Sequence, residues 1–151
     1  MAVITPFLWF DDDLEEAIEL YASVFDDVVV HDVSRNPDGS AFIAEVEIAG
    51  QRLKLLNGGP AFRFNEAFSL FVECDGQAEV DRCWDALTAD GGEESQCGWL
   101  KDRFGLSWQI VPRQFGELMA AGDAEQAARV MAAMRTMTRF DVAALQAAFD
   151  G

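Results

Sequence analysis

The stretch FLWFDDDLEEAIELYASVF, residues 7–25, decides the architecture of this chain. Its first four residues are bulky and apolar, as in a half-buried strand. The remainder changes to a helical period, with acidic residues in the first turn, where the helix dipole favours negative charge. The apolar face of that helix would consist of Leu14, Ala17, Ile18, Tyr21 and Phe25. The stretch therefore predicts a strand, an acidic turn and an amphipathic helix.

The same order returns in SLFVECDGQAEVDRCWDALTA, residues 69–89. The two stretches form a weak internal repeat of about 60 residues, visible in periodicity more than in identity. Each is followed by segments that alternate like strands and are separated by turn residues. These segments span 28–34, 41–50 and 51–57 in the first copy, and 91–96, 97–103 and 105–111 in the second. The sequence therefore predicts an α+β fold built from two βαβββ modules.

The predicted organisation has four parts within one structural domain. They are a first module at 1–58, a connector at 59–66, a second module at 67–112 and C-terminal helices at 113–151. In the last part, helices are expected over 125–137 and 141–149, with Asp123 and Asp141 as N-caps. A stripe of Met131, Met134 and Met137 on the first of these helices predicts packing on the sheet or on a second subunit.

Composition excludes several partners. The 151 residues carry a formal net charge of −16, which repels phosphate backbones and anionic bilayers, so we expect neither nucleic-acid nor membrane binding. The first 13 residues lack the basic region of a secretory leader. Three cysteines, an odd number, fit a reducing compartment. A cytoplasmic location is therefore expected.

Three longer sequence stretches point to a family: ITPFLWFDDD at 4–13, LLNGGPAFRFN at 55–65 and QCGWLKDRFGLSWQIVP at 96–112. With the helical tail, they resemble the PhnB-like branch of the vicinal oxygen chelate superfamily, whose members often carry the label 3-demethylubiquinone-9 3-methyltransferase. The superfamily includes glyoxalase I and extradiol dioxygenases. The resemblance implies that two cupped sheets face one another around a cavity, within one chain or between swapped chains, and that the protein is a homodimer.

Metal-dependent members of that superfamily take His, Gln or Glu ligands from the first and last strands of each module. This chain has one histidine, His31, and it falls in the second predicted strand, away from those positions. The implied positions instead carry Thr5, Phe7, Trp9, Asn57, Ser69, Phe71, Glu73 and Gln109. A divalent metal needs several converging ligands, so we expect no metal and no cofactor. A weak site of Glu73, Gln109 and Asn57 stays open as an alternative.

A methyltransferase that uses S-adenosylmethionine would usually show a glycine-rich turn between a strand and a helix. Here NGGP, residues 57–60, leads into AFRFN instead. Cys97 is expected to share a strand face with Trp99 and Lys101, as a small apolar residue rather than a nucleophile.

Strand alternation then predicts a ligand site. Leu106, Trp108 and Ile110 fall on one face, which should pack on helices, and the opposite face should line the cavity. The predicted ligand-binding residues are Phe7, Trp9, Asn57, Ser69, Phe71, Trp99 and Gln109. Such walls suit a small apolar or aromatic ligand. The residues leave three alternatives open: a binding protein, an enzyme acting with metal or on a quinone-like substrate, and a dry core with no ligand.

Overall fold

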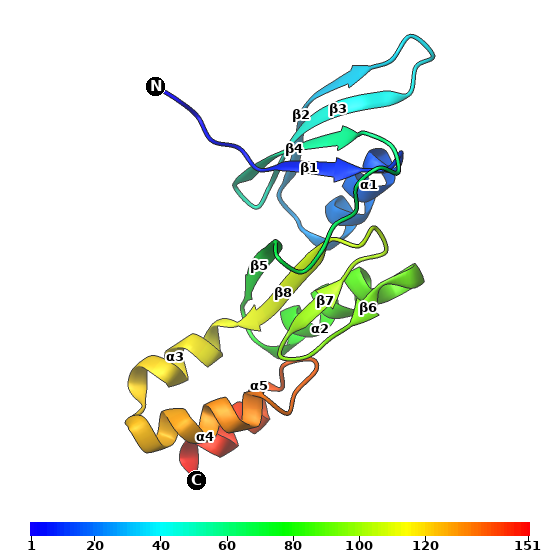
Figure 1. The fold of residues 1–151 in the computed structure, drawn as a ribbon. Helices are drawn as coiled ribbons and strands as arrows, with labels where there is room; N and C mark the ends of the chain where they lie inside the picture. The colour runs from blue at the N-terminus through cyan, green and yellow to red at the C-terminus, as the bar shows by residue number, and fades with distance from the viewer. The chain divides into compact units, whose positions relative to one another are not determined.

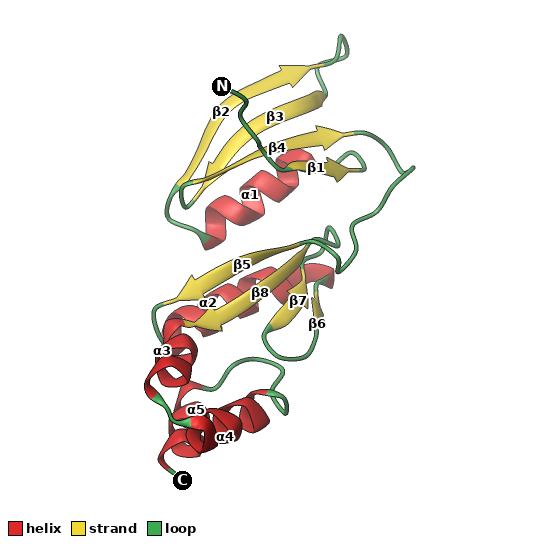
Figure 2. Cartoon of the chain, turned by 60° about the vertical axis from the view of Figure 1, so that its left-hand side comes forward, coloured by secondary structure: helices red, strands yellow, loops and turns green.

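The computed structural model describes residues 1–151 (Figure 1). The chain divides into two compact units, Met1–Phe64 and Asn65–Gly151. Each unit contains a four-stranded mixed sheet with a helix on one of its faces, as Figure 2 shows. The predicted α+β class and the tandem βαβββ pattern are therefore confirmed. No helix is long and apolar enough to cross a bilayer.

The first unit follows the predicted order. Its elements are β1 (Phe7–Phe10), α1 (Leu14–Val24), β2 (Val28–Arg35), β3 (Ala41–Ile48) and β4 (Gln51–Asn57). The strands lie in the order β1-β4-β3-β2, and only the β1–β4 pair is parallel. The β3–β4 hairpin closes through Ala49 and Gly50, which both adopt positive φ, as a tight primed turn requires.

Helix α1 buries the face that periodicity predicts. Leu14, Ala17 and Tyr21 are fully buried, and Ile18 is half-buried. Leu20 and Val24 are buried as well, so the apolar face is wider than expected. These side chains pack on β3 and β4, and together with the buried residues of β1 they form the core of this unit.

The second unit repeats the pattern with shorter strands. Its module consists of β5 (Ser69–Cys74), α2 (Gln77–Thr88), a 3₁₀ turn (Ala89–Gly91), β6 (Glu93–Glu94), β7 (Trp99–Lys101) and β8 (Ser107–Pro112). The sheet order is β5-β8-β7-β6, with β5 and β8 parallel. The buried face of α2 is Val80, Cys83, Trp84 and Leu87. This face comes directly from the 3.6-residue period.

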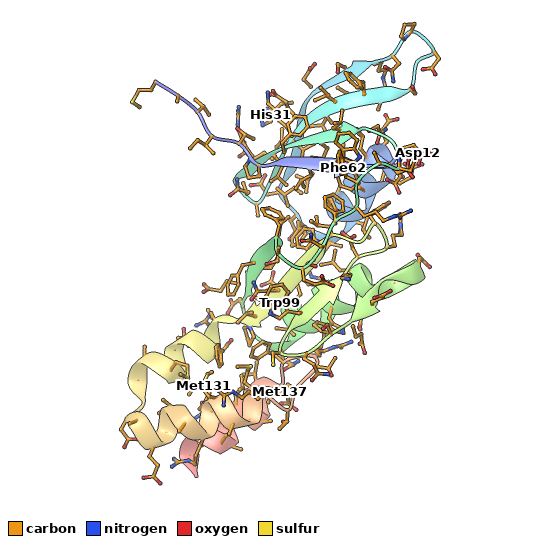
Figure 3. All side chains as sticks on the ribbon, in the orientation of Figure 1. Asp12, His31, Phe62, Trp99, Met131 and Met137 are labelled. Carbon is orange, nitrogen blue, oxygen red and sulfur yellow. The ribbon has the colours of Figure 1, made fainter.

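The tail of the second unit contains α3 (Arg113–Ala121), α4 (Ala124–Met134) and α5 (Val142–Asp150). Asp123 and Asp141 cap α4 and α5 through their side chains, as predicted. Helix α3, which begins directly after β8, was not predicted as a separate element. The expected helix over 125–137 ends at Met134, so Met137 lies outside it and the methionine stripe is not one helical face (Figure 3). The β-branched Thr136 and Thr138 disfavour its continuation.

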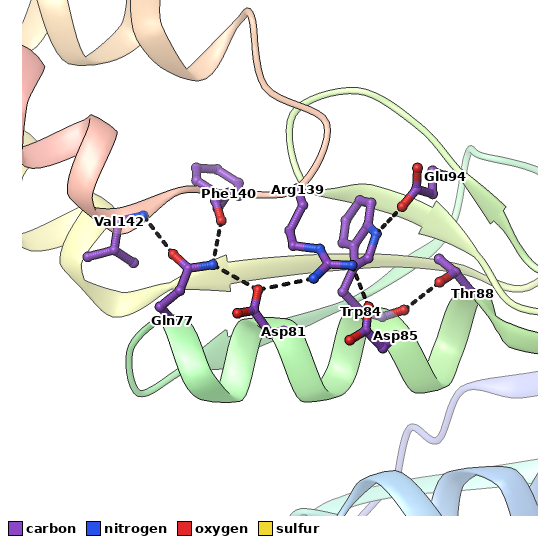
Figure 4. Close-up of polar contacts among 9 residues, drawn as sticks. All are labelled: Gln77, Asp81, Trp84, Asp85, Thr88, Glu94, Arg139, Phe140 and Val142. Atoms are coloured by element: carbon purple, nitrogen blue, oxygen red, sulfur yellow. Dashed lines mark hydrogen bonds and ion pairs between the residues drawn. The ribbon is translucent and has the colours of Figure 1, made fainter.

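The tail is fastened to α2 through the side chains in Figure 4. Gln77 donates from Nε2 to the Phe140 carbonyl at 3.0 Å and accepts at Oε1 from the Val142 amide at 2.8 Å. Arg139 bonds to Asp81 at 3.2 Å and also to Asp85. The tail therefore packs on its own module through fixed polar contacts.

The Cys97–Gly98 turn also contacts the tail. The amides of Cys97 and Gly98 donate to the carbonyls of Met137 and Thr138, both at 2.8 Å. A Cβ at Gly98 would overlap the Phe140 ring. Cys97 has a φ of 58° and lies in a turn before β7, so its predicted place on a strand face with Trp99 and Lys101 is wrong. The cause is this backbone pairing with the tail.

Candidate ligand-binding site

Three predicted site residues form one row across the second sheet. The register aligns Phe71 of β5 with Gln109 of β8, and Gln109 with Trp99 of β7. The next row on the same face is Ser69, Ser107 and Lys101. We call this side of the sheet, which carries both rows, the distal face. The other side carries Leu100, Trp108 and Ile110, which are buried on the α2 side.

The distal face combines an exposed ring with an oriented amide. Phe71 is 60% exposed, although it lies in the middle of a strand. Gln109 donates from Nε2 to the Ser69 hydroxyl at 3.0 Å, which fixes the amide plane. Trp99 is half-buried on β7 (Figure 3). A planar ligand would therefore meet aromatic surface on both sides of a polar group.

A cleft of about 380 Å³ adjoins Trp99 at the β6 side of the sheet. Its lining includes Trp99, Lys101, Ser107, Glu66 and Glu93. Ser107 is 1% exposed, and its hydroxyl has no hydrogen-bond partner. A buried hydroxyl without a partner loses its hydration without compensation. The cleft therefore contains one polar atom that a ligand would satisfy.

Lys101 and Ser107 lie directly opposite one another across β7 and β8. A lysine beside a serine suggests a nucleophile with its base, which requires a neutral amine. Here the Glu66 carboxylate lies 2.5 Å from Lys101 Nζ. Its hydrogen bond raises the pKa of Lys101 above the ordinary lysine value. The ammonium therefore stays protonated at neutral pH, and the pair does not fit serine nucleophile chemistry.

In the first unit, Trp9 is held by the NGGP segment. Its indole Nε1 donates to the Gly59 carbonyl at 2.8 Å, and its ring meets Phe62 edge-on at 5.0 Å. A Cβ at Gly58 would overlap the indole. Phe7, the other predicted aromatic of β1, is 53% exposed. Gly58 therefore leaves room for the Trp9 ring, and the Gly59 carbonyl accepts from its indole N–H.

The Asn57 side chain joins three backbone segments of the first unit. Its Nδ2 donates to the carbonyls of Asp12 at 3.2 Å and Ala41 at 3.1 Å, and its Oδ1 accepts from the Leu14 amide at 3.0 Å. The last bond replaces the N-cap of α1, because the Asp13 side chain makes no capping bond. Both amide hydrogens of Asn57 are thus used within the unit, and we leave it out of the proposed site.

The residues present do not fit a divalent metal. No group of three or more His, Cys, Asp or Glu side chains in the chain is arranged to hold a metal ion. His31 lies 3.2 Å from Glu47, away from the positions that the superfamily uses. The Asn57 Oδ1 already accepts from the Leu14 amide, Gln109 offers a neutral amide oxygen, and Glu73 is the one charged group among those positions. A hard or borderline cation needs more anionic or imidazole donors than that.

Comparison with known proteins identifies the family of this chain. The family model described as 3-demethylubiquinone-9 3-methyltransferase matches residues 2–111. The chain belongs to this family. Its match ends at Val111, so the tail helices of this family member lie outside it. Together with the Bacillus cereus PhnB protein described below, this match places the chain in the PhnB-like branch of the vicinal oxygen chelate superfamily, as the resemblance implied.

A PhnB protein of Bacillus cereus, provisionally described as a 3-demethylubiquinone-9 3-methyltransferase, is 29% identical with a TM-score of 0.68. The similarity covers 74% of this chain and 99% of that one. A Pseudomonas aeruginosa protein is 20% identical over 74% of this chain and 98% of its own, with a TM-score of 0.57. FosX of Listeria monocytogenes, a fosfomycin resistance protein complexed with Mn(II) and sulfate, is 14% identical with a TM-score of 0.51. The similarity covers 72% of this chain and 87% of FosX. The last two show the fold alone. No curated protein matches.

Proposed function

We propose that this protein binds a small, partly aromatic molecule on the distal face of its second sheet, without a metal ion. The observation that carries the proposal is the row Phe71–Gln109–Trp99, which spans three adjacent strands. It offers two rings separated by an amide that Ser69 orients. Strands hold such groups more rigidly than loops do, which lowers the ordering cost of binding.

The exposure of Phe71 supports a ligand on this face. A phenylalanine ring in a strand interior that is 60% exposed leaves apolar surface in water. Trp99 lies in the same row with the Gln109 amide between the two rings, and apolar surface with polar groups around it is typical of ligand sites. A stacked aromatic ring would bury part of that surface and gain the usual aromatic contact energy.

Two enzymatic functions, metal-assisted catalysis and methyl transfer, have less support. Metal-assisted chemistry would need anionic donors that the implied positions lack, with Glu73 as the single charged residue among them. Methyl transfer from S-adenosylmethionine would use a glycine-rich turn for the cofactor. In this chain the glycine at position 58 is required by the Trp9 ring. The family description therefore tells which proteins this chain is related to, and we propose ligand binding, not methyl transfer, as its function.

A titration tests the proposal. Quinones, planar heteroaromatics and aromatic acids are titrated into the protein by calorimetry, with tryptophan emission followed in parallel. Trp99→Ala and Phe71→Ala should each weaken a binding ligand about tenfold or more, because each removes one wall. Phe42→Ala is the matched control, since Phe42 is 43% exposed but belongs to the first unit. No heat and no emission change with any ligand would refute the proposal.

We further infer a homodimer and a cytoplasmic location. Strand β2 is an edge strand that carries Val29 and Val30, which are 42% and 48% exposed, and uncovered apolar edges favour association. All three cysteines are free, as in a reducing compartment. Light scattering at micromolar concentration should give twice the 16.6 kDa chain mass, and Val30→Lys should lower it. A monomer mass for the unsubstituted protein would contradict the dimer.

A further inference from the structure

The charges of the cleft beside Trp99 indicate which aromatic ligands the site selects. Resting on the binding function proposed above, we propose that the site prefers organic cations, meaning an aromatic ring that carries a protonated amine or amidinium. The ring would lie against Trp99, and the N–H groups would point to the Ser107 hydroxyl and the Glu93 carboxylate. Each of these three residues lines the cleft.

The lining is acidic on balance. Two of the lining carboxylates, those of Glu66 and Glu93, lie beside the one ammonium of the lining, that of Lys101. Lys101 is already paired with Glu66 at 2.5 Å. Glu94 aligns with Leu100 and accepts from the Trp84 indole at 2.6 Å (Figure 4), so its carboxylate points to the α2 side. The unpaired carboxylate beside Lys101 is that of Glu93. The potential in the cleft therefore favours a positive ligand group.

Ser107 provides an independent sign of a ligand. Its side chain is 99% buried, lines the cleft and has no hydrogen-bond partner. A hydroxyl has two acceptor lone pairs, so an ammonium or amidinium N–H can donate to it. Such a bond would compensate the lost hydration of that oxygen, and a hydrocarbon ligand would leave the loss in place.

Trp99 favours the same charge. The face of an indole ring carries negative potential and attracts cations more strongly than any other side-chain ring. Trp99 is half-buried, so water competes for that attraction less than at an exposed ring. An anionic ligand should bind more weakly. To pair with Lys101 it would have to displace Glu66, and it would then lie next to the Glu93 carboxylate. The Trp99 ring and the Glu93 carboxylate thus favour a positive ligand group, and the Ser107 hydroxyl can accept from it.

A matched ligand series tests this preference. Calorimetry compares 1-naphthylmethylamine, 1-naphthalenemethanol and 1-naphthoate, which share one ring system and differ in charge. At pH 7 and low salt the amine should bind about tenfold more tightly than the alcohol, and the naphthoate most weakly. The amine's advantage should shrink as salt is raised. Equal affinities, or tightest binding of the naphthoate, would overturn the inference while leaving the binding function intact. If none of the three binds, the proposed function itself fails.

Two charge-removing variants separate the cleft from the overall field of the acidic protein. Glu93→Gln should weaken the amine several-fold and leave the alcohol unchanged. Glu125→Gln removes the same charge from α4, where the side chain is 85% exposed and does not line the cleft. It should leave both ligands unchanged. Equal losses in the two variants would assign the preference to net charge and overturn a selective cleft.

Discussion

Asp102 and Trp108 are joined by a hydrogen bond inside the second unit. The indole Nε1 of Trp108 donates to Asp102 Oδ2 at 2.9 Å, and both residues are at most 2% exposed. The other oxygen of Asp102 accepts from the amides of Phe104 at 3.0 Å and Leu106 at 3.1 Å. One carboxylate thus fixes the turn between β7 and β8 and the indole behind the distal face.

Asp102→Asn should therefore lower the free energy of unfolding, although the two side chains have nearly the same size and shape. The amide would turn N–H groups toward a donor, which leaves a buried donor unpaired and costs about 1–3 kcal/mol. Urea denaturation measures this as a lower midpoint at unchanged slope. Asp26→Asn, at an exposed position, is the control and should be neutral. A midpoint for Asp102→Asn equal to that of the control would show that the bonds contribute nothing.

Gly58→Ala tests how NGGP holds Trp9. A Cβ at this position would overlap the indole, so the ring must move or the backbone must shift. We expect a loss of about 1–3 kcal/mol of unfolding free energy together with a shift in tryptophan emission. Gly116→Ala is the matched control, because nothing lies within 4 Å of a Cβ at that position in α3. It should be neutral or stabilising by about 0.5–1 kcal/mol. The same response in both variants would contradict the packing role of Gly58.

Gln77→Ala tests the fastening of the tail. The change removes the bonds to the Phe140 carbonyl and the Val142 amide, so the segment before α5 should open more often. Trypsin should then cleave after Arg135 or Arg139 several-fold faster than in the unsubstituted protein. Gln51→Ala changes an exposed glutamine of the first unit and should leave that rate unchanged. Unaltered cleavage in Gln77→Ala would mean that the tail is held by its apolar contacts alone.

The cysteines should differ in reactivity. Cys74 and Cys83 are buried, and the hydrogen bond that the Cys74 thiol donates to Cys83, together with burial, raises the pKa of Cys74. Cys97 is half-buried in the turn before β7. A disulfide reagent at pH 8 should therefore modify one thiol per chain quickly, and Cys97→Ser should abolish that fast phase. Three equally fast thiols in the native protein would contradict the burial of the pair.

The sequence predicts those parts of the fold that depend on local pattern. The buried face of α2 follows from helical period, and strand alternation predicts the face on which Phe71, Gln109 and Trp99 lie, whereas their alignment in one row comes from the register in the structure. It does not predict features that distant segments impose. Cys97 adopts a left-handed backbone because its amide pairs with Met137, forty residues along the chain. The Asn57 side chain is committed to the start of α1, and only the structure shows that the Ser107 hydroxyl has no partner.

The most direct test of the distal-face site uses the four tryptophans as separate probes. In a two-dimensional ¹H–¹⁵N spectrum of the labelled protein, each indole N–H gives its own signal during titration with 1-naphthylmethylamine. We predict that the Trp99 signal and the side-chain amide signals of Gln109 shift progressively. Trp84 and Trp108, which are buried on the α2 side, should stay in place. Shifts confined to Trp9, or saturation without any change at Trp99 and Gln109, would contradict a ligand site on this face.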